Sequence, residues 1–445
     1  MERGQKSLLT DFLRYVFATT TSLLVFSLYS MVDGLMVARG VGKYGMSAVN
    51  LAIPFTNALF SIGVLFAVGT STVTAICLAQ NKRQEANALF SQNLAVLTVI
   101  GLLITVLVSA FMEPFVQLLG ADAITRAHVT AYLRGLSPFS LCFLISYNLE
   151  VLIKTDGHPQ LAMKTVITGC LTNCVMDYVA IFILKLGTFG AAAATGLSQL
   201  LTCVIYLTHF LRGNSTFHIC LFRFDWYALR RVLPIGFADG ITELCTGLMI
   251  FLYNRTLLST IGTDGVVTYT VISYVNTIVV NLMVGISQGM QPLVSFHYGK
   301  SDQHACRTLL RYGMICAACF AMAVLVSVEA AAPLIVQVFL KESGTALAAY
   351  SIRAFRIFSV SYLIIGFNVV AGGFLTALER PRPAICISIG RGLLVQSACL
   401  IALVALLGGE GIWCTAIVSE GLCLIATLWI LRRNLSTLTD APADR

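Results

Sequence analysis

Six carboxylic acids lie inside long apolar stretches of the sequence, where ionised side chains are rare. They are Asp33, Asp177, Asp239, Glu243, Glu329 and Glu420. An ionised carboxylate near the middle of a membrane-spanning helix costs about 2.5–3.5 kcal/mol on insertion scales. We therefore expect some of these acids to bind a proton or another cation, because either partner offsets the buried charge.

Asp33 and Asp177 are placed to form a proton-binding pair. Each precedes a basic residue at the outer end of its helix, Arg39 or Lys185, and at 1.5 Å per residue both acids lie roughly 9–12 Å below those ends. Asn173 is one turn from Asp177 on the same face, within hydrogen-bonding reach. Two carboxyl groups that share a low-dielectric site bind protons more readily than they do in water. The alternative interpretation is a pair of polar residues that neighbouring helices satisfy.

Asp239 and Glu243 form a second candidate site. They are four residues apart on one predicted helix and share a face, where they would bind a cation or a second proton, or simply line a polar cleft. The internal repeat described below aligns Tyr253 with Asp33, so the second half lacks that acid and proton handling is expected in the first half. The remaining acids are interpreted as interfacial or packing residues: Glu113, Glu150, Glu329 and Glu420.

The helices that carry these acids are predicted to span a membrane. Of the 445 residues, 57% are hydrophobic and 11% are charged, whereas a soluble domain has about 25% charged residues. Apolar runs of about 20 residues, enough to cross the hydrocarbon core, recur along the chain, so we predict an all-α membrane protein with about twelve transmembrane helices. The predicted spans cover residues 12–38, 47–78, 90–118, 128–153, 161–185, 190–211, 232–258, 266–297, 310–339, 348–377, 384–407 and 411–432.

The spans divide into two halves that resemble each other. A shift of about 220 residues aligns three glycines of each half: Gly42 with Gly262, Gly45 with Gly265 and Gly69 with Gly289. Such a parallel repeat predicts two pseudo-symmetric six-helix bundles with a cleft between them. We predict an N-terminal lobe at 1–212, a cytoplasmic linker at 213–231 and a C-terminal lobe at 232–445.

No metal, nucleotide or enzyme site is predicted. The segment Gly299–Ser301 resembles the end of a phosphate-binding loop, but Val294 replaces its first glycine and an apolar helix precedes it. A membrane-embedded prenyl transferase would need clustered aspartates to hold magnesium, and neither D-x-x-D nor D-D occurs. We therefore expect no metal, no cofactor and no catalysis, with an ion gradient as the energy source.

Several segments resemble the multidrug and toxic compound extrusion (MATE) family. The similar segments are Met31–Val37 with Ser47–Pro54, then Lys154–Pro159, Asn173–Asp177 and Gly190–Thr195, and finally Gln291–Gly299. The resemblance covers nearly the whole chain, in order, and is closest to the bacterial proton-coupled branch. It implies two six-helix bundles and the export of organic cations or drugs in exchange for protons or sodium ions.

The resemblance also implies roles for particular residues. A first-lobe proton network would consist of Asp33, Asn173, Asp177 and Thr195, with Tyr132 beside it. Glu243 is similar to an acid that some relatives use for sodium, but the companion acid on the tenth span is missing, since 366–377 offers only Asn368.

The first helix departs from the family pattern. Relatives often carry a proline there, and residues 12–39 have none. We expect the hydroxyl cluster Thr19–Ser22 to loosen the helix instead, because such side chains can bond back to helix carbonyls.

We predict a secondary multidrug transporter, monomeric in the lipid bilayer, that exports small organic cations by antiport with protons or, as the other possibility, sodium. A flippase for lipid-linked sugars shares this architecture but lines its cleft with basic residues, whereas the candidate residues here are acidic. The formal net charge of +8 is attributed to membrane topology, not to a nucleic-acid partner.

Both termini are predicted to lie in the cytoplasm of a cell-membrane protein. An even number of spans puts them on one side, where roughly twenty of the 29 Lys and Arg residues fall, and positive charge is retained in the cytoplasm. A reporter fused after Arg445 that works only in the cytoplasm should be active. Activity of an exported-only reporter at the same position would contradict this topology.

Overall fold

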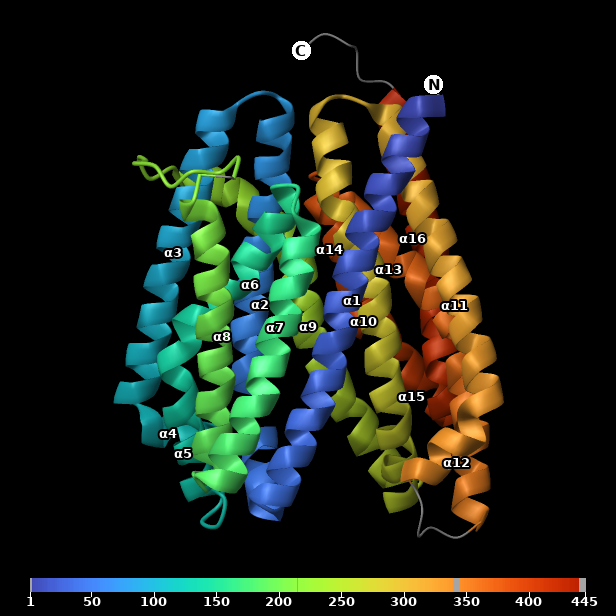
Figure 1. The fold of residues 1–445 in the computed structure, drawn as a ribbon. Coiled ribbons are helices and arrows are strands. Elements are labelled where there is room, and N and C mark those ends of the chain that lie inside the picture. Colours follow the sequence, from blue (N-terminus) through green and yellow to red (C-terminus); the bar gives the residue numbers. More distant parts are fainter. Residues whose placement is uncertain (1, 214, 340–344, 440–445) are drawn as a thin grey trace. The chain divides into compact units, whose positions relative to one another are not determined.

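The computed structural model describes residues 2–213, 215–339 and 345–439, and the described chain is almost entirely helical (Figure 1). Within those ranges 12 helices are long and apolar enough to cross a membrane, which confirms the predicted all-α class. The first six spans are α1 (Glu2–Gly40), α2 (Lys43–Ala79), α3 (Arg83–Ala110) with the short α4 (Met112–Leu118), α5 (Arg126–Leu136) continued by η1 (Ser137–Phe139) and α6 (Ser140–Thr155), α7 (Pro159–Tyr178) with the π-helical η2 (Val179–Ile183), and α8 (Gly187–Leu211).

The second six spans follow the same order. They are α9 (Trp226–Thr260), α10 (Thr263–Gly299), α11 (Gln303–Phe339), α12 (Thr345–Ser359) with α13 (Tyr362–Ala377), α14 (Pro381–Ile389) continued by the π-helical η3 (Gly390–Leu394) and α15 (Val395–Leu407), and α16 (Gly409–Thr439). The fourth span of each half is interrupted, and the fifth span of each half contains a π-helical segment. The turns agree as well, since Gly42 and Gly262 both have φ near +90° (85° and 90°) before the second helix of their half, a conformation that favours glycine.

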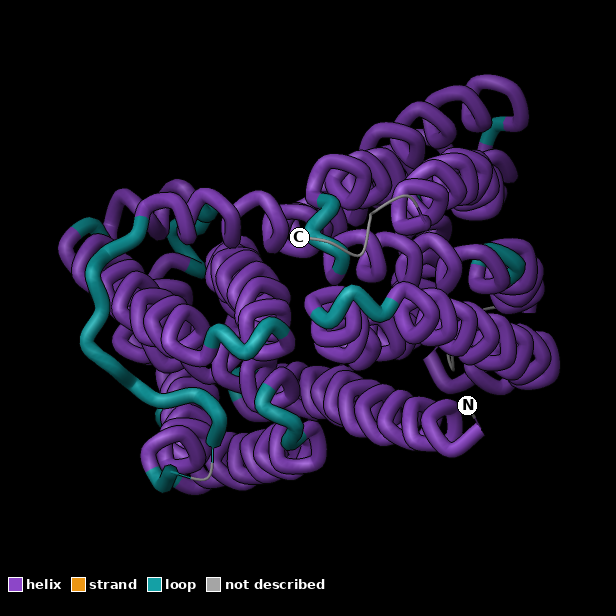
Figure 2. Tube along the Cα trace, turned by 90° about the horizontal axis from the view of Figure 1, so that it is seen from above, coloured by secondary structure: helices purple, strands orange, loops and turns teal. Residues whose placement is uncertain are grey.

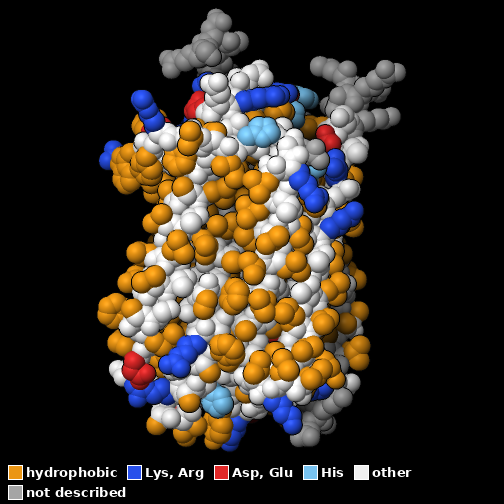
Figure 3. Space-filling view, turned by 60° about the vertical axis from the view of Figure 1, so that its left-hand side comes forward, with side chains coloured by type: hydrophobic (Ala, Val, Ile, Leu, Met, Phe, Trp, Pro, Cys, Tyr) orange, Lys and Arg blue, Asp and Glu red, His pale blue; other side chains and the backbone are white. Residues whose placement is uncertain are grey.

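Apolar side chains on the outer helices are exposed, as a lipid environment requires. On α3, Val99, Leu103 and Val106 are each more than half exposed. On the face drawn in Figure 3, hydrophobic side chains cover the middle, and Lys and Arg gather toward the two ends. Lipid tails solvate such a surface, so it does not indicate a protein partner.

The chain forms two compact units, one of residues 21–240 and one of residues 1–20 with 241–445. Each has its own apolar core, centred on α2, α5, α6 and α8 in the first case and on α9, α10, α12, α13 and α16 in the second. We call these the N-terminal unit and the C-terminal unit. The division falls inside α1 and α9 rather than in the linker, because the first part of each helix packs with the other half's second helix.

Small residues make this packing possible. In the C-terminal unit, α10 carries Gly285 and Gly289 in the G-x-x-x-G spacing typical of close helix contacts. A Cβ at Gly289 would lie 2.8 Å from the Cα of Val16 on α1, and one at Gly285 would lie 2.7 Å from the Cα of Thr20. In the N-terminal unit, a Cβ at Gly69 of α2 would lie 2.2 Å from the carbonyl oxygen of Val232 on α9. The aligned glycines Gly69 and Gly289 therefore each allow a close helix contact in their own unit.

The linker is held along the N-terminal unit by hydrogen bonds from its backbone. Helix α9 begins at Trp226, so the described non-helical part is shorter than the predicted 213–231. The backbone N–H groups of His218, Cys220 and Asp225 donate to Asn87, Ser91 and Gln92 of α3 at 3.0, 2.9 and 2.8 Å. Phe217 is fully buried and stacks on Phe90. Figure 2 shows this segment as the long teal trace.

The Gly289 contact can be tested with a matched pair of glycine substitutions. Alanine is favoured over glycine in a helix by about 1 kcal/mol, so both Gly289→Ala and Gly421→Ala gain this favourable helix propensity. A Cβ at Gly421 of α16 meets nothing within 4 Å. We expect Gly289→Ala to lower the stability of the purified protein by about 1–3 kcal/mol through overpacking, with Gly421→Ala neutral or stabilising in thermal unfolding. Equal effects would contradict the packing argument.

Candidate ion and substrate site

The structure brings Asp33 of α1 and Asp177 of α7 together inside the N-terminal unit. Asp177 is fully buried and Asp33 is half-buried, and their carboxyl groups are within hydrogen-bonding reach of each other. A carboxylate only accepts hydrogen bonds, so the two acids can bond to each other only when one of them carries a proton. The arrangement is therefore a site at which a proton can bind and be released.

Helix packing fixes this pair. The C-terminal end of α1 is anchored by Val37, which is buried against Ile181 of η2 and Ala191 of α8. The close approach continues at Gly40, where a Cβ would overlap the side chain of Ile181. Asp177 is the penultimate residue of α7, which ends at Tyr178 directly before the π-helical η2, and π segments often occur at functional sites.

Asn173 and Thr195 complete the network that the sequence predicted. Asn173 is buried one turn before Asp177. With its amide turned so that the nitrogen faces the acid, Asn173 Nδ2 donates to Asp177 Oδ2 at 2.6 Å and Oδ1 accepts from the backbone N–H of Thr195 at 3.1 Å. Amide orientation is assigned from such partners, and this one satisfies both ends of the side chain. The Thr195 hydroxyl donates to the carbonyl of Ala191 at 3.0 Å.

Two tyrosines complete the surroundings of the acid pair. Tyr132 of α5 is buried and lies close enough to interact electrostatically with both Asp33 and Asp177. Tyr29, one turn before Asp33 on α1, does so as well, and the sequence analysis missed it. Its spacing of four residues from Asp33 was the available signal. One oxygen of each acid, Oδ1, is buried without a hydrogen-bond partner in the described protein, so the site has unused acceptor capacity.

A cavity of about 720 Å³, including its open mouth, adjoins this network in the N-terminal unit. Aromatic side chains dominate the lining, which contains Phe26, Tyr29, Phe60, Phe143, Tyr147 and Tyr206. Asn173 and Tyr29 belong both to this lining and to the surroundings of the acid pair.

Glu150 also lines the cavity, which changes its interpretation as an interfacial or packing residue. Its carboxylate pairs with Lys154 at 2.8 Å, and the Lys154 side chain is only 2% exposed. The pair is spaced i, i+4 on α6, and a lysine that follows an acid at that spacing inside an apolar span was the sequence signal. Gln199 and Ser146 add a polar edge to the cavity, hydrogen-bonded to each other at 2.6 Å.

Asp239 and Glu243 share helix α9 as predicted, but the division between the compact units falls between them. Asp239 is half-buried and Glu243 is exposed. Asn368 of α13, the residue that replaces a companion acid, is buried and does not turn to Glu243. Its Nδ2 donates to Glu420 of α16, to Oε2 at 2.7 Å and to the backbone carbonyl at 3.0 Å.

Glu420 is also paired with an arginine that is largely covered, an ion pair inside the unit that fits the packing rather than the interfacial interpretation of this acid. Arg391 of η3 donates from Nε to Glu420 Oε1 at 2.7 Å, and the side chains are 15% and 9% exposed. The sequence analysis overlooked Arg391, although an arginine in the apolar span 384–407 is itself a signal.

The expected loosening of α1 by its hydroxyl cluster, Thr19–Ser22, stays a prediction. The hydroxyls of Thr19 and Thr20 are buried without a hydrogen-bond partner in the described chain, whereas Ser22 takes part in an interaction. Nearer to Asp33, Ser27 bonds back to the Leu23 carbonyl at 2.8 Å and Ser30 to the Phe26 carbonyl at 2.9 Å. Such back-bonding tends to bend helices.

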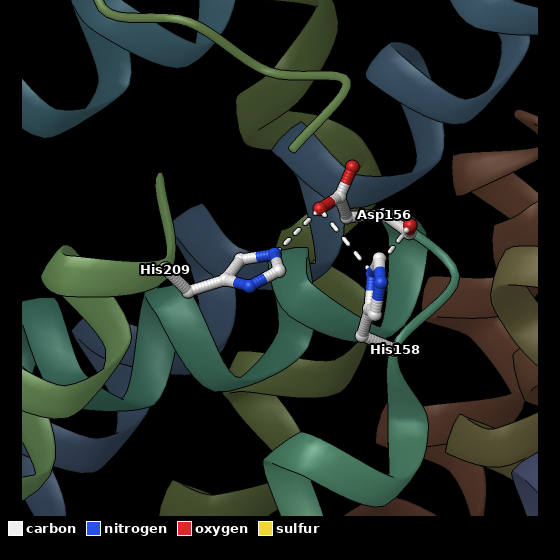
Figure 4. Close-up of side chains that lie close together, drawn as sticks. All are labelled: Asp156, His158 and His209. Atoms are coloured by element: carbon white, nitrogen blue, oxygen red, sulfur yellow. Dashed lines mark hydrogen bonds and ion pairs between the residues drawn. The ribbon is translucent and has the colours of Figure 1, made fainter. Parts of the chain in front are cut away.

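Asp156, His158 and His209 form a cluster whose potential ligand atoms lie within 4.8 Å of one another (Figure 4). His209 Nε2 lies 2.7 Å from Asp156 Oδ2, and His158 Nδ1 lies 3.0 Å from the Asp156 backbone carbonyl. The other carboxylate oxygen accepts bonds from the backbone and hydroxyl of Thr216. Protein donors thus already occupy the carboxylate, and we interpret the cluster as the anchor that fastens the linker to the ends of α6 and α8.

Comparison with known proteins identifies the family. The MatE family profile matches residues 18–179 and 241–398, which is more than half of the chain, and this protein therefore belongs to the MATE family of membrane transporters. Multidrug export protein MepA of Staphylococcus saprophyticus is 22% identical over 438 residues, with 95% of this chain and 94% of that protein covered. The MepA of Staphylococcus haemolyticus is 24% identical over 433 residues, with 94% and 92% covered. The chain is a multi-pass protein of the cell membrane.

Solved structures agree on the fold. An outward-facing multidrug resistance MATE family transporter of the MOP superfamily superposes with a TM-score of 0.92 at 20% identity, with 97% of this chain and 96% of that chain covered. A MOP superfamily transporter from Pyrococcus furiosus gives 0.91 at 20% identity, with 97% and 96% covered. These similarities confirm the twelve-helix architecture.

The linker anchor can be tested by proteolysis. Asp156→Ala removes the acceptor for Thr216 and His209, which should cost about 1–3 kcal/mol because donors are left unpaired. We expect trypsin to cleave the linker at exposed Arg223 faster in this variant. His158→Ala leaves the bonds to Thr216 and His209 in place and should be cleaved at the wild-type rate. Equal cleavage of Asp156→Ala and wild type would show that the cluster does not hold the linker.

Proposed function

We propose that this protein is a multidrug exporter that carries organic cations out of the cell in exchange for protons. The observation that carries the proposal is the buried pair Asp33 and Asp177, next to an aromatic cavity with which it shares Asn173 and Tyr29. The similarity to proteins named as multidrug export proteins supports the drug-export part.

The chemistry of the pair favours protons over sodium as the driving ion. A sodium ion needs several oxygen ligands at once. Here one Asp177 oxygen is bonded to the Asn173 amide, whereas the carboxyl groups already stand where they can share a proton. At the second candidate site Glu243 lies on the exposed side of α9, and Glu420, the acid buried in the C-terminal unit, is paired with Arg391.

The cavity chemistry favours a cationic, partly apolar substrate. Aromatic faces attract cations within about 6 Å of the ring centroid. The described lining includes no Lys or Arg, and its one carboxylate, Glu150, is paired with Lys154 behind it. A flippase for pyrophosphate-linked sugars would need basic residues at this place. A cavity lined by many aromatic rings binds a substrate through apolar contact area and electrostatic attraction. Neither requires one particular shape, so substrates of different shapes can bind.

Coupling follows if the proton and the drug favour different arrangements of the same helices. Asn173 touches the acid pair on one side and the cavity on the other, so protonation that frees or recruits its amide changes the cavity wall. A ligand shifts a conformational equilibrium only through its differential affinity for the two states. Proton binding at the pair would then weaken drug binding in the cavity. Drug binding would weaken proton binding by the same free energy.

The proposal predicts that Asp33→Asn and Asp177→Asn lose drug export driven by a pH gradient. Asparagine keeps the size of the acid but cannot release a proton. We expect losses of roughly 5–150-fold, the range of a coupling free energy of about 1–3 kcal/mol. Ethidium efflux from energised vesicles, with proton and sodium gradients imposed separately, measures this.

Asp239→Asn is the matched control, since it makes the same change at an acid outside the pair, and it should keep most of the export. Folding of all three variants is checked by thermal unfolding in detergent. Export by Asp33→Asn and Asp177→Asn at the wild-type rate, or efflux that a sodium gradient alone sustains, would refute proton coupling at this site.

A further inference from the structure

The two units can be compared position by position, because their helices begin in register. Helices α6 and α13 begin at Ser140 and Tyr362, α7 and α14 at Pro159 and Pro381, and α8 and α16 at Gly187 and Gly409. Each pair of first residues is separated by 222 positions. The same shift therefore identifies which residues of the C-terminal unit stand where the N-terminal unit has its cavity.

Three small residues of the cavity wall correspond to the three members of the buried charge cluster. Ser146, Gly169 and Ser198 line the cavity, and the shift maps them onto Asn368, Arg391 and Glu420 respectively. A hydroxyl, a hydrogen atom and a hydroxyl are replaced by an amide, a guanidinium and a carboxylate. We take these larger side chains of the C-terminal unit to stand where the N-terminal unit has its open volume.

Glu420 bonds to both of the other side chains. It accepts from Arg391 Nε at 2.7 Å on one oxygen and from Asn368 Nδ2 at 2.7 Å on the other, whereas Asn368 Oδ1 is buried without a hydrogen-bond partner in the described chain. Asn368 is fully buried and Glu420 is 7% exposed. The arginine side chain comes from the π-helical η3. Glu420 and Arg391 depend on each other, because an unpaired buried ion costs several kcal/mol.

The acid pair of the N-terminal unit has no counterpart either. The shift maps Asn173 onto Val395 and Asp177 onto Cys399, and the repeat of the first helices places Tyr253 opposite Asp33. Tyr253 is buried, and its hydroxyl accepts from Gln396 Nε2 at 3.4 Å. The buried acid of this region, Glu420, is therefore already neutralised by a cation that the chain itself supplies.

We infer that Arg391 is a built-in cation that occupies a latent organic-cation site in the C-terminal unit, with Glu420 as the counter-ion, and that shortening Arg391 opens this site to external cations. Buried ion pairs add little net stability compared with apolar residues of similar volume, so stability alone does not require this pair. Its effect is on specificity, since it restricts cation binding to the N-terminal unit. The inference rests on the proposed function only in taking the N-terminal cavity as the cation site of the wild type.

The first experiment counts binding sites. Tetraphenylphosphonium binding to purified protein in nanodiscs is measured by equilibrium dialysis at neutral and at alkaline pH, so that protonation of a freed Glu420 is not mistaken for a closed site. We expect one site in the wild type and two in Arg391→Ala. The double variant Arg391→Ala/Glu420→Gln lacks the counter-ion and should return to one site.

The matched control is Arg356→Ala, which breaks the exposed pair of Arg356 with Glu329 in the same unit and should keep one site. Tyr147→Ala in the N-terminal cavity separates the two proposals. If it leaves wild-type binding unchanged, the substrate assignment of the proposed function fails, while the difference between Arg391→Ala and the double variant still tests the inference.

The second experiment uses chemical rescue and does not depend on a large probe. Arg391→Ala should unfold at a lower temperature than wild type because Glu420 loses its partner. Methylguanidinium at concentrations that leave the wild type unaffected should restore at least half of that loss, since a ligand that binds only the folded state stabilises it. It should not rescue the double variant.

If Arg391→Ala cannot be purified, Arg391→Gln, which retains a donor for Glu420 but no charge, takes its place with the same expected signs. The inference is overturned if the folded variant binds tetraphenylphosphonium with wild-type stoichiometry at both pH values and methylguanidinium does not raise its unfolding temperature.

Discussion

Burying carboxylates among apolar helices is the constraint on which the rest of this structure depends. An ionised acid cannot stay in a low-dielectric interior unless something offsets its charge. The protein does this in three ways. Asp33 and Asp177 stand where they can share a proton, Glu150 is paired with Lys154 on its own helix, and Glu420 is paired with Arg391 from a neighbouring span. Under the proposed function, only the first arrangement exchanges its positive charge, a proton, with the surroundings.

Close helix packing makes such placement reliable. Glycines at contacts between helices let backbones approach until a single Cβ would collide, as at Gly69 and Gly289. In a membrane, where lipid is as apolar as a side chain, this contact area is a main source of helix association. The C-terminal end of α1 is fixed in the same way by Val37 and Gly40 against Ile181. The position of Asp33 relative to Asp177 is therefore set by apolar contacts one to two turns away.

The two halves show how one architecture supports different chemistry. Their turns, interrupted fourth spans and π-helical fifth spans correspond, yet the first half has an acid pair and a cavity and the second has the ion pair of Glu420 with Arg391. Repeats related in this way preserve backbone geometry while single side chains differ. Fold similarity to other MATE transporters consequently predicts the helices much better than it predicts which unit carries ions and drugs.

The sequence by itself determined the membrane class, the twelve spans, the repeat and the family. The lengths of the apolar runs and the spacing of the glycines are local properties that can be read without a structure. It also singled out Asp33, Asn173 and Asp177, since polar residues in apolar runs stand out, and the resemblance to the family added Thr195. Only the tertiary structure decided the partner of Glu420, the presence of Tyr29 beside the acids, and the division of the units inside α1 and α9. Arg391 and Glu420 are 29 residues apart in the chain, and no spacing rule relates residues on different helices. Their pairing depends on how the spans pack, which is a property of the whole unit rather than of any segment.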